Sequence, residues 1–441
     1  MHLSIADTDV ISPLGVTLLL SCCIALLAVD RKYALWPILV MVFFVSQAQR
    51  ITIFTMDFTQ MRILVLVGLA RCLISGELTS LKRHTLDYLV IGYALIMALA
   101  HLARAGQEAI VYELGQLVNL IVPYFVFRCL VQNYEDLMNA IKVLSIMSVL
   151  VAPFFVYEHF TGHNIFSVFG GVPAISEMRQ GRIRSQGAFS HSIIAGTYFA
   201  VIMPLIVAQI WNNNKALAVA GSISGLLIIV VSASSTPVFT LFSAFLAAMF
   251  FYFREQMQGV RWAVFFTLLL LHIVMKAPVW HLISRVSASG GSTSWYRYML
   301  IDVTINHFSS WWLMGSSAYF GWYAYGLFDL TNQYVLSATS GGLAALILFI
   351  SIITVAFGEV GRSWRKAEDD RGKVMMSWAL GCSLFAICMS FIGVALWGQM
   401  VMLWPMVLAM IATSDEALEG ARSSVEQAQL PINASAKGSE I

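Results

Sequence analysis

Arginine side chains gather in two polar stretches of an otherwise apolar chain. The first stretch contains the sequence MRQGRIRSQGAFSHS, and the second contains SRVSASGGSTSWYR. Their arginines are Arg179, Arg182, Arg184, Arg285 and Arg297. A guanidinium is planar, is always charged and can bind a phosphate through two parallel N–H donors. These stretches therefore predict an anion site, and a lipid-linked sugar diphosphate is the anion we expect. Arg184 and Arg297 are the first candidates, and solvated loop arginines are the alternative.

Two histidines accompany these arginines, and a histidine can move a proton near neutral pH. His191 follows the first cluster and His307 follows the second. We expect them to be candidate bases, although a structural hydrogen-bonding role is the common one for a single loop histidine. Glu158 and Glu177 are carboxylate alternatives, and Glu158 is also expected to bind substrate.

The sequence predicts neither a metal site nor a cofactor. The six cysteines lie in or beside apolar runs and show no metal-ligand spacing. The triplet Asp7-Thr8-Asp9 has the form that many metal-dependent glycosyltransferases use, but we interpret it as a chance match near the N-terminus.

The composition is that of a membrane protein. Hydrophobic residues make up 59% of the 441 residues and charged residues only 11%, whereas soluble domains carry about 25% charged residues. The mean hydropathy is +0.77. A net charge of +2 is too small to indicate nucleic-acid binding.

We predict an all-α polytopic membrane protein with about 12 or 13 spans, since a span needs about 20 apolar residues. Residues 1–412 form a single transmembrane domain, and 413–441 form a disordered cytoplasmic tail. No cleavable signal peptide is evident. The predicted spans are 13–29, 34–49, 57–75, 86–103, 111–130, 137–158, 190–211, 216–233, 237–253, 262–279, 333–357, 374–393 and 396–412.

Basic residues in the short loops set the expected orientation. They are Arg31, Lys32, Lys82, Arg83, Lys215, Arg254, Arg261 and the basic residues between Arg362 and Lys373. If these loops face the cytoplasm, two long loops, about 159–189 and 280–332, face outside. We expect short amphipathic helices in them, one of them over Trp295–Phe308, and a helix capped by Ser190 or Ser192 after the first basic cluster.

The two long loops resemble those of the O-antigen ligase and Wzy-type O-antigen polymerase superfamily. The first matching block is Arg184-Ser-Gln-Gly187-Ala-Phe189. The second is Arg285, a Gly/Ser turn, Arg297 and then Leu313-Met-Gly315. The third is Thr331-Asn332-Gln-Tyr334, followed by Ser340-Gly-Gly342. Thr331 replaces the histidine usual in this family, and Ser340 replaces the usual acidic residue. These departures favour a polymerase over a ligase.

The resemblance implies a metal-independent, inverting glycosyltransferase in a bacterial inner membrane, with its active site facing the periplasm. An undecaprenyl-diphosphate-linked glycan would be the donor. The acceptor would be another lipid-linked repeat unit or, for a ligase, lipid A–core. Asn332 and Tyr334 would position the acceptor, and Arg179, Arg182 and Arg285 would support diphosphate binding. A flippase and a chain-length regulator are the expected protein partners.

Two rival functions remain open. A transporter or flippase for lipid-linked oligosaccharide predicts a midplane site, broken helices and an internal repeat, and the sequence shows no sign of these. A structural membrane subunit would not need arginines concentrated in the outer loops.

Overall fold

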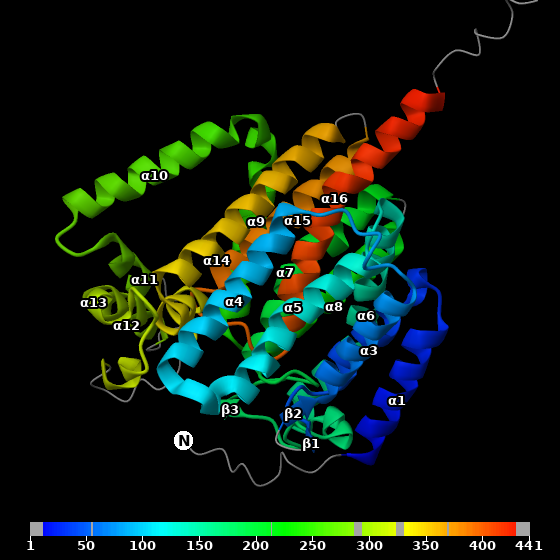
Figure 1. Ribbon diagram of the computed structural model, residues 1–441, viewed down its shortest axis with the longest axis horizontal. Coiled ribbons are helices and arrows are strands. Elements are labelled where there is room, and N and C mark those ends of the chain that lie inside the picture. Colours follow the sequence, from blue (N-terminus) through cyan, green and yellow to red (C-terminus); the bar gives the residue numbers. More distant parts are fainter. Residues whose placement is uncertain are drawn as a thin grey trace, which may run out of the picture.

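A computed structural model describes residues 12–53, 56–212, 214–285, 293–322, 330–367 and 370–428. These residues are mostly helical (Figure 1), and the strands among them form two short antiparallel hairpins. The hairpins pair β1 (Arg50–Ile53) with β2 (Met56–Thr59) and β3 (Met178–Arg179) with β4 (Arg182–Ile183). The prediction of an all-α membrane fold is confirmed at this level.

The helices follow the predicted order along the chain. The N-terminal ones are α1 (Pro13–Ala28), α2 (Leu35–Phe44), α3 (Gln60–Ile74), α4 (Thr85–Ala105), α5 (Ile110–Leu130) and α6 (Tyr134–Thr161). The central ones are α7 (Ser192–Ala208), α8 (Lys215–Val231), α9 (Ser235–Met249), α10 (Met257–Val274), α11 (Leu282–Arg285), α12 (Thr293–Asn306) and α13 (Phe308–Trp311). The last are α14 (Gln333–Lys366), α15 (Arg371–Ser390) and α16 (Met400–Ala428).

Several boundaries differ from the predicted ones. In the span predicted over 34–49, the helix ends at Phe44. The first residues of the span predicted over 57–75 belong to strand β2. The helix predicted from Trp295 is α12, which begins two residues earlier. Helix α16 continues to Ala428, so the chain is still helical where the sequence predicted a disordered tail. Residues 429–441 lie outside the described residues.

Six helical stretches of the described chain are long and apolar enough to cross a membrane. They are Thr85–Leu130, Tyr134–Thr161, Ser192–Asn212, Ser235–Val274, Gln333–Lys366 and Arg371–Ser390. The first and fourth each contain two helices, and three shorter apolar helices accompany them. The total of 12 or 13 spans therefore stays a prediction.

Helix α7 forms the centre of the bundle and packs against α8, α9 and α15. Nearly all of its residues are buried. A Cβ on Gly196 would lie 2.5 Å from atoms of both Ser232 and Pro237, so glycine lets α7 approach the turn between α8 and α9. Phe189 and Phe199 stack edge-on against Phe43 beside it.

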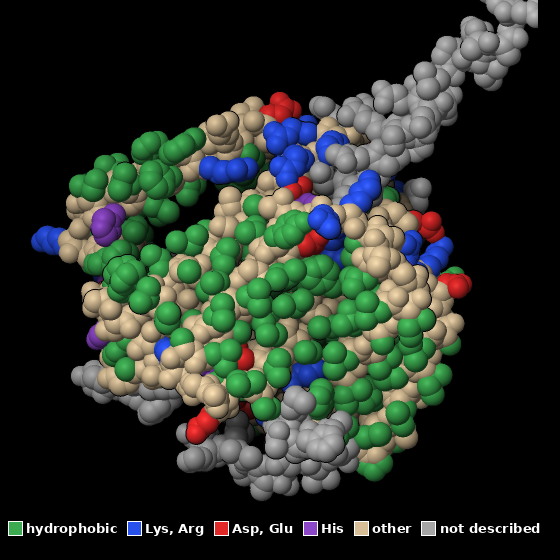
Figure 2. Space-filling view, viewed as in Figure 1, with side chains coloured by type: hydrophobic (Ala, Val, Ile, Leu, Met, Phe, Trp, Pro, Cys, Tyr) green, Lys and Arg blue, Asp and Glu red, His purple; other side chains and the backbone are tan. Residues whose placement is uncertain are grey.

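The connections with basic residues meet at one end of the bundle. Arg31, between α1 and α2, pairs with Asp136 at the start of α6 at 3.1 Å. The Tyr134 hydroxyl donates to Asn212, after α7, at 2.9 Å. Asn212 in turn donates to the carbonyl of Gly372, after α14, at 3.5 Å. Figure 2 shows lysines and arginines gathered along the upper edge, and we call this the basic end.

Helix α14 is broken at Gly342, whose φ of 74° and ψ of −172° are not helical. In the first half, the side chain of Gln333 bonds to Tyr93 of α4 at 3.2 Å. Later in that half, the carbonyl of Ser340 accepts from Arg104, near the end of α4, at 2.8 Å. The first half of α14 therefore runs alongside α4 in the same direction.

The second half of α14 runs back along α4. Phe349 stacks against Tyr93, with ring centroids 5.5 Å apart. Further on, Glu359 pairs with His84, just before the start of α4, at 3.2 Å. The chain therefore turns back on itself at Gly342, and the expectation that broken helices are absent is wrong. The sequence does not predict this break, because Ser-Gly-Gly-Leu lies within the predicted span 333–357 and contains no charged residue or proline.

Candidate functional site

Arg184 is almost completely buried, although it lies in a long loop. Its Nη1 donates to Oε2 of Glu177 at 2.8 Å, and its backbone N–H donates to the Glu177 carbonyl at 3.0 Å. Burial lowers the pKa of the guanidinium, while the Glu177 carboxylate raises it. Nε of Arg184 has no hydrogen-bond partner among the described residues. The guanidinium thus keeps a buried donor for another oxygen.

The hairpin before Arg184 carries two more of the predicted arginines. Arg179 and Arg182 face each other as a cross-strand pair in the β3–β4 register, and both are exposed. Like charges placed directly opposite are unfavourable unless something neutralises them. Arg179 is also close enough to lower the pKa of Arg184. The three arginines therefore form one positively charged group.

Glu158, near the end of α6, holds the loop that carries Arg184. Its carboxylate accepts from Ser176 Oγ at 2.7 Å and from the backbone N–H groups of Gln186 and Gly187 at 2.9 and 2.8 Å. The side chain is 1% exposed. This geometry gives Glu158 a structural role in the loop. The substrate-binding role predicted for it stays a prediction.

His191 caps α7, where the sequence predicted Ser190 or Ser192, so that prediction of the cap is wrong. Its Nδ1 accepts from the backbone N–H of Ile193 at 3.1 Å, which places the proton of a neutral ring on Nε2. Nε2 lies 3.8 Å from Oε2 of Glu177. The neutral ring of His191 therefore donates a hydrogen bond at Nε2 and does not act as a base there. The hydroxyl of Ser192 is buried without a partner among the described residues.

Arg297, on α12, reaches into the bundle from the second long loop. Its Nη2 donates to Oγ1 of Thr236, in the first turn of α9, at 2.6 Å. A Cβ on Gly393 would lie 2.5 Å from Nε of Arg297, so the guanidinium packs against this glycine. Burial lowers the pKa of Arg297. Within the described chain no carboxylate pairs with it, so this partly buried charge has only neutral partners.

The connection between α15 and α16 joins the two long loops. We call residues 391–399 the connector. Its Gln399 accepts from the backbone N–H of Ser190 at 3.1 Å and donates to the carbonyl of Ala188 at 3.0 Å. Its Gly393 touches Arg297. The predicted spans 374–393 and 396–412 left only Val394 and Ala395 between them, because the connector is apolar and its sequence resembles that of a helix.

The start of α14 is anchored to the same connector. Asn332 caps α14 by accepting from the backbone N–H groups of Tyr334 and Val335 at 2.9 and 3.1 Å, and it donates to the carbonyl of Ile392 at 3.3 Å. The Tyr334 hydroxyl donates to the carbonyl of Cys388 at 2.9 Å. Both residues predicted to position an acceptor thus bond to the backbone in this structure.

The two long loops are both bonded to the turn between α8 and α9, close to Arg184 in the first loop and through Arg297 in the second. Beside Arg184, the backbone N–H of Ser185 donates to the carbonyl of Val231 at 3.1 Å, while Arg297 bonds to Thr236. Between them Ala233 has a φ of 45°, a conformation that is uncommon for residues other than glycine. We call this turn, the connector, Arg184 and Arg297 the arginine junction.

Four helices begin at the arginine junction, namely α7, α9, α14 and α16. The N-terminus of a helix carries a positive partial charge and unpaired N–H groups, so it attracts anions. The junction therefore combines the buried guanidinium of Arg184 and the partly buried guanidinium of Arg297 with several helix N-termini. An anion of high charge, such as a diphosphate, is the ligand that such an arrangement stabilises best.

The remaining predicted residues, His307 and Arg285, show no contact with the arginine junction within the described part of the chain. His307 donates from Nδ1 to the carbonyl of Val303 at 2.9 Å and stacks on Trp322, with ring centroids 4.7 Å apart. In the neutral ring, Nε2 therefore carries the lone pair and can accept a proton as a base. Arg285 ends α11 and is exposed.

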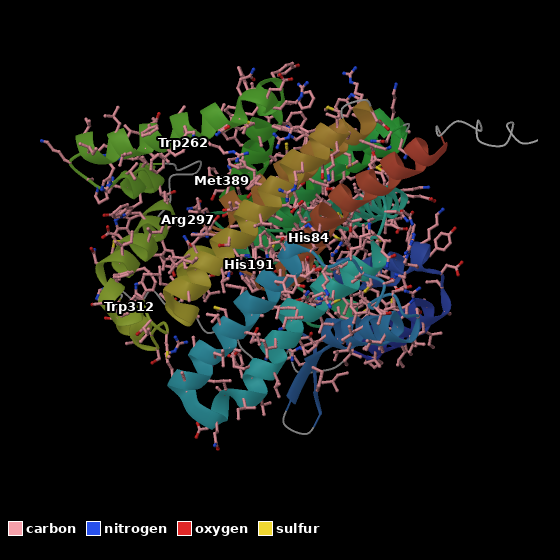
Figure 3. The ribbon with its side chains drawn as sticks, turned by 45° about the horizontal axis from the view of Figure 1, so that its top comes forward. His84, His191, Trp262, Arg297, Trp312 and Met389 are labelled. Atoms are coloured by element: carbon pink, nitrogen blue, oxygen red, sulfur yellow. The ribbon has the colours of Figure 1, made fainter. Side chains whose placement is uncertain are left out.

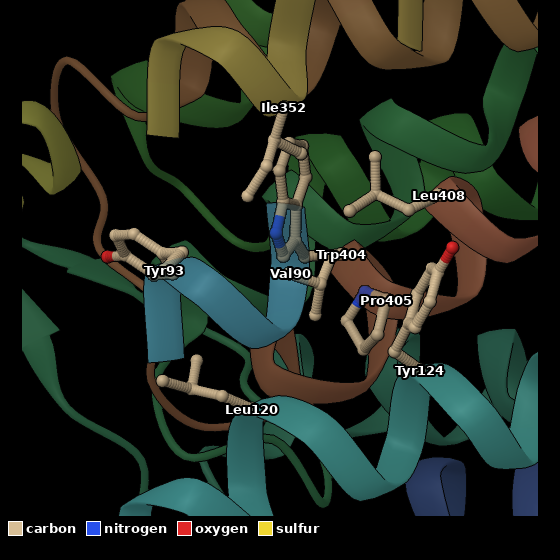
Figure 4. Close-up of a pocket in the computed structure, with 8 residues that line it drawn as sticks. All are labelled: Val90, Tyr93, Leu120, Tyr124, Ile352, Trp404, Pro405 and Leu408. Carbon is tan, nitrogen blue, oxygen red and sulfur yellow. The ribbon is translucent and has the colours of Figure 1, made fainter. Parts of the chain in front are cut away.

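An apolar pocket lies among α4, α5, α14 and α16, away from these arginines (Figure 4). Its lining is Val90, Tyr93, Leu120, Tyr124, Ile352, Trp404, Pro405 and Leu408. It offers no charged group for a diphosphate. In the described part of the chain, no three His, Cys, Asp or Glu side chains group as metal ligands. The triplet at Asp7 lies outside that part.

Comparison with known proteins adds no relative. No family model matches the chain, and no curated protein matches it.

Proposed function

We propose that this protein is a membrane glycosyltransferase of the O-antigen polymerase and ligase type. It would transfer a glycan from an undecaprenyl-diphosphate carrier to an acceptor sugar, and polymerisation of exopolysaccharide or O-antigen repeat units is the favoured reaction. The observation that carries the proposal is that Arg297 is partly buried without a carboxylate partner in the described chain, at a junction that also holds the buried Arg184.

The proposed reaction places negative charge where these arginines lie. The acceptor hydroxyl attacks the anomeric carbon, the bond from that carbon to the diphosphate oxygen breaks, and the lipid diphosphate leaves with the electron pair. Guanidinium groups fixed beside the leaving oxygens stabilise the transition state more than the ground state. Arg184 Nε and the N-terminus of α9, which has no side-chain cap, would bind further oxygens.

The acceptor proton needs a base, and the geometry separates the candidates. His191 donates at Nε2, so it suits a hydrogen bond to a phosphate oxygen. Glu177 lies between His191 and Arg184 and is half exposed, which makes it a carboxylate candidate for the base. His307 has the right tautomer and belongs to the connection between α12 and α13.

The membrane orientation in this proposal follows from the two ends of the bundle. Short basic loops favour the cytoplasmic side, so the basic end would face the cytoplasm and the arginine junction the periplasm of a bacterial inner membrane. The 12 or 13 spans, a flippase that delivers the donor and a chain-length regulator belong to the same proposal. Attachment of the glycan to lipid A–core is the alternative within the enzyme class.

A transporter of lipid-linked oligosaccharide is a second candidate function, and one observation favours it. Helix α14 is broken at Gly342, and broken helices form the substrate sites of many transporters. The two functions differ in turnover, because a transporter would move a lipid-linked glycan without lengthening it.

Glycan length in cells separates the candidates. A strain that lacks the gene would be complemented with wild type, Arg184→Ala, Arg297→Ala or, as a matched control, Arg83→Ala at the basic end. Membrane insertion is measured in parallel. A polymerase predicts that both junction variants insert and accumulate single lipid-linked repeats, whereas Arg83→Ala restores polymer. Long unligated chains would indicate a ligase. Normal polymer from both junction variants would refute the proposed site.

A further inference from the structure

Helix α10 lies apart from the bundle. Its main contacts are with the short helices at its two ends, Phe250–Gln256 and Val279–His281, and none of its residues is buried against the described chain. Its exposed side chains include Trp262, Phe266 and Leu270. Figure 2 shows open space between α10 and the body of the molecule. An apolar helix exposed on every side is expected only where apolar chains surround it.

The preceding helix, α9, also leaves an apolar face uncovered. Val238, Phe242, Phe245 and Met249 are exposed, by 48%, 61%, 62% and 54% respectively. These residues follow each other at three- or four-residue intervals and so form one stripe along α9. The opposite side of α9 packs on α7 and α15. Helices α9 and α10 are consecutive, yet both keep their apolar surfaces free.

This open space has a charged group at one end. The bonded pair Arg297 and Thr236 marks the N-terminal end of α9. The short helix Val279–His281, which follows α10, is tied to α12, which carries Arg297, by a bond of 2.9 Å from Trp280 Nε1 to Asp302. Figure 3 again shows α10 apart from the bundle, with Arg297 and Met389 beneath Trp262. The exposed apolar surfaces of α9 and α10 therefore lie near the partly buried guanidinium of Arg297.

We propose that the space between α9 and α10 holds the polyprenyl chain of an anionic lipid whose diphosphate binds Arg297. The inference rests on the proposed function and specifies which part of the surface takes the lipid. Charge complementarity selects this occupant, because the partly buried guanidinium of Arg297, without a carboxylate partner in the described chain, favours an anion beside the apolar surfaces of α9 and α10. Bilayer phospholipid also fits apolar walls, but its binding would not depend on Arg297.

Photo-crosslinking in vesicles tests the location of the chain. Benzoyl-phenylalanine replaces Phe245 on α9 or Phe266 on α10, and Leu20 on the exposed face of α1 serves as the control position. The vesicles contain phosphatidylethanolamine, phosphatidylglycerol and a small fraction of undecaprenyl diphosphate. We expect undecaprenyl adducts at positions 245 and 266 and much fewer at position 20. Adding Arg297→Ala should remove them. Phospholipid adducts alone, or adducts unchanged by Arg297→Ala, would overturn the proposal.

Competition by prenyl diphosphates of two lengths supplies a second measurement. Undecaprenyl diphosphate or farnesyl diphosphate is added as a competitor. The loss of long-chain lipid adducts to the Phe266→benzoyl-phenylalanine variant is then measured. Replacing both Phe242 and Phe245 by alanine removes two large apolar contacts, and each is worth about tenfold in affinity. We expect at least a tenfold loss of competition by the long chain and little change for the short one. Equal losses for both lengths would contradict a chain site.

The result is separable from the proposed function. Adducts at both positions together with absent glycosyl transfer would keep the lipid site and refute the enzyme. Glycosyl transfer that depends on Arg297, without adducts at either position, would keep the enzyme and refute this chain site.

Discussion

Arg297 donates to Thr236 at 2.6 Å, and this bond joins the second long loop to the first turn of α9. The partner is a neutral hydroxyl, whereas Arg184 at the same junction pairs with a carboxylate. A buried charge is stable only with compensation. Because the described residues supply no acid at Arg297, the arrangement is that of a site completed by an anionic ligand.

Replacement of Arg297 tests this compensation directly. Arg297→Ala should reduce glycosyl transfer by about 100-fold or more, the usual effect of removing one donor to a developing oxyanion. Arg297→Lys keeps the charge but loses the planar pair of donors, so it should recover only part of the rate. The rate is measured in membranes at matched protein levels, with Arg83→Ala as the control. Full activity of Arg297→Lys would show that charge alone is sufficient.

The pair of Arg184 and Glu177 predicts opposite effects for its two members. Arg184→Gln removes a donor and should lower both donor affinity and turnover. Glu177→Gln removes a competing anion from Arg184, so KM for the lipid-linked donor should fall by a few-fold, about 1 kcal/mol of binding energy. If Glu177 is also the base, turnover falls while KM improves. A rise in KM with Glu177→Gln would contradict the competing role.

Glu158 should matter for stability as well as activity. Its carboxylate accepts three hydrogen bonds inside the protein, from Ser176, Gln186 and Gly187. Glu158→Gln retains the shape but faces backbone N–H donors with an amide nitrogen, at a cost of about 1–3 kcal/mol. We expect a lower Tm and faster proteolysis within the loop 162–191. Glu135→Gln, in an exposed pair with Lys32, should change neither.

The break in α14 requires glycine at position 342. A Cβ there would lie 2.6 Å from the carbonyl oxygen of Leu313, and its φ is positive. The backbone N–H of Leu343 donates to the carbonyl of Trp312 at 2.8 Å beside it. Gly342→Ala should therefore displace the segment around Leu313, costing about 1–3 kcal/mol in strain. Gly259→Ala, in open space on α10, is the control. Equal thermal stability of the two variants would contradict a required break.

Arg104 secures the same segment and gives a related prediction. Its guanidinium donates to the backbone carbonyl of Met314, in the second long loop, and to that of Ser340, two residues before the break. Arg104→Ala should loosen the second long loop and make Trp312, already exposed, quench faster with iodide or acrylamide. Arg104→Lys should restore part of the order. Unchanged quenching in Arg104→Ala would show that the other backbone bonds hold the loop alone.

The sequence predicted the features that follow from residue type. Apolar runs predicted the helices, and Arg184 and Arg297 stand out because loop arginines are conspicuous in an apolar chain. The short basic connections were predicted to share one side of the membrane. Two of them, at Arg31 and Gly372, lie at one end of the bundle. They are linked there through Asp136, Tyr134 and Asn212.

Features that arise from tertiary contacts were not predictable in this way. The connector is apolar, so neither Gly393 nor Gln399 stands out, although both hold the arginine junction together. The sequence could not show that Glu158 holds its loop, because its three partners come from positions 18 to 29 residues further along the chain. The turn at Gly342 depends on backbone dihedral angles that a run of small residues permits but does not require.

The most direct test of the central claim is transfer by the purified protein in liposomes. The donor and acceptor are undecaprenyl-diphosphate-linked oligosaccharide, and product length is followed by mass spectrometry with and without EDTA. The account predicts longer lipid-linked glycan and free undecaprenyl diphosphate from wild type and Arg83→Ala, and about 100-fold less from Arg297→Ala. If no glycan is lengthened by wild type, or if Arg297→Ala matches it, the arginine junction is not a glycosyl-transfer site.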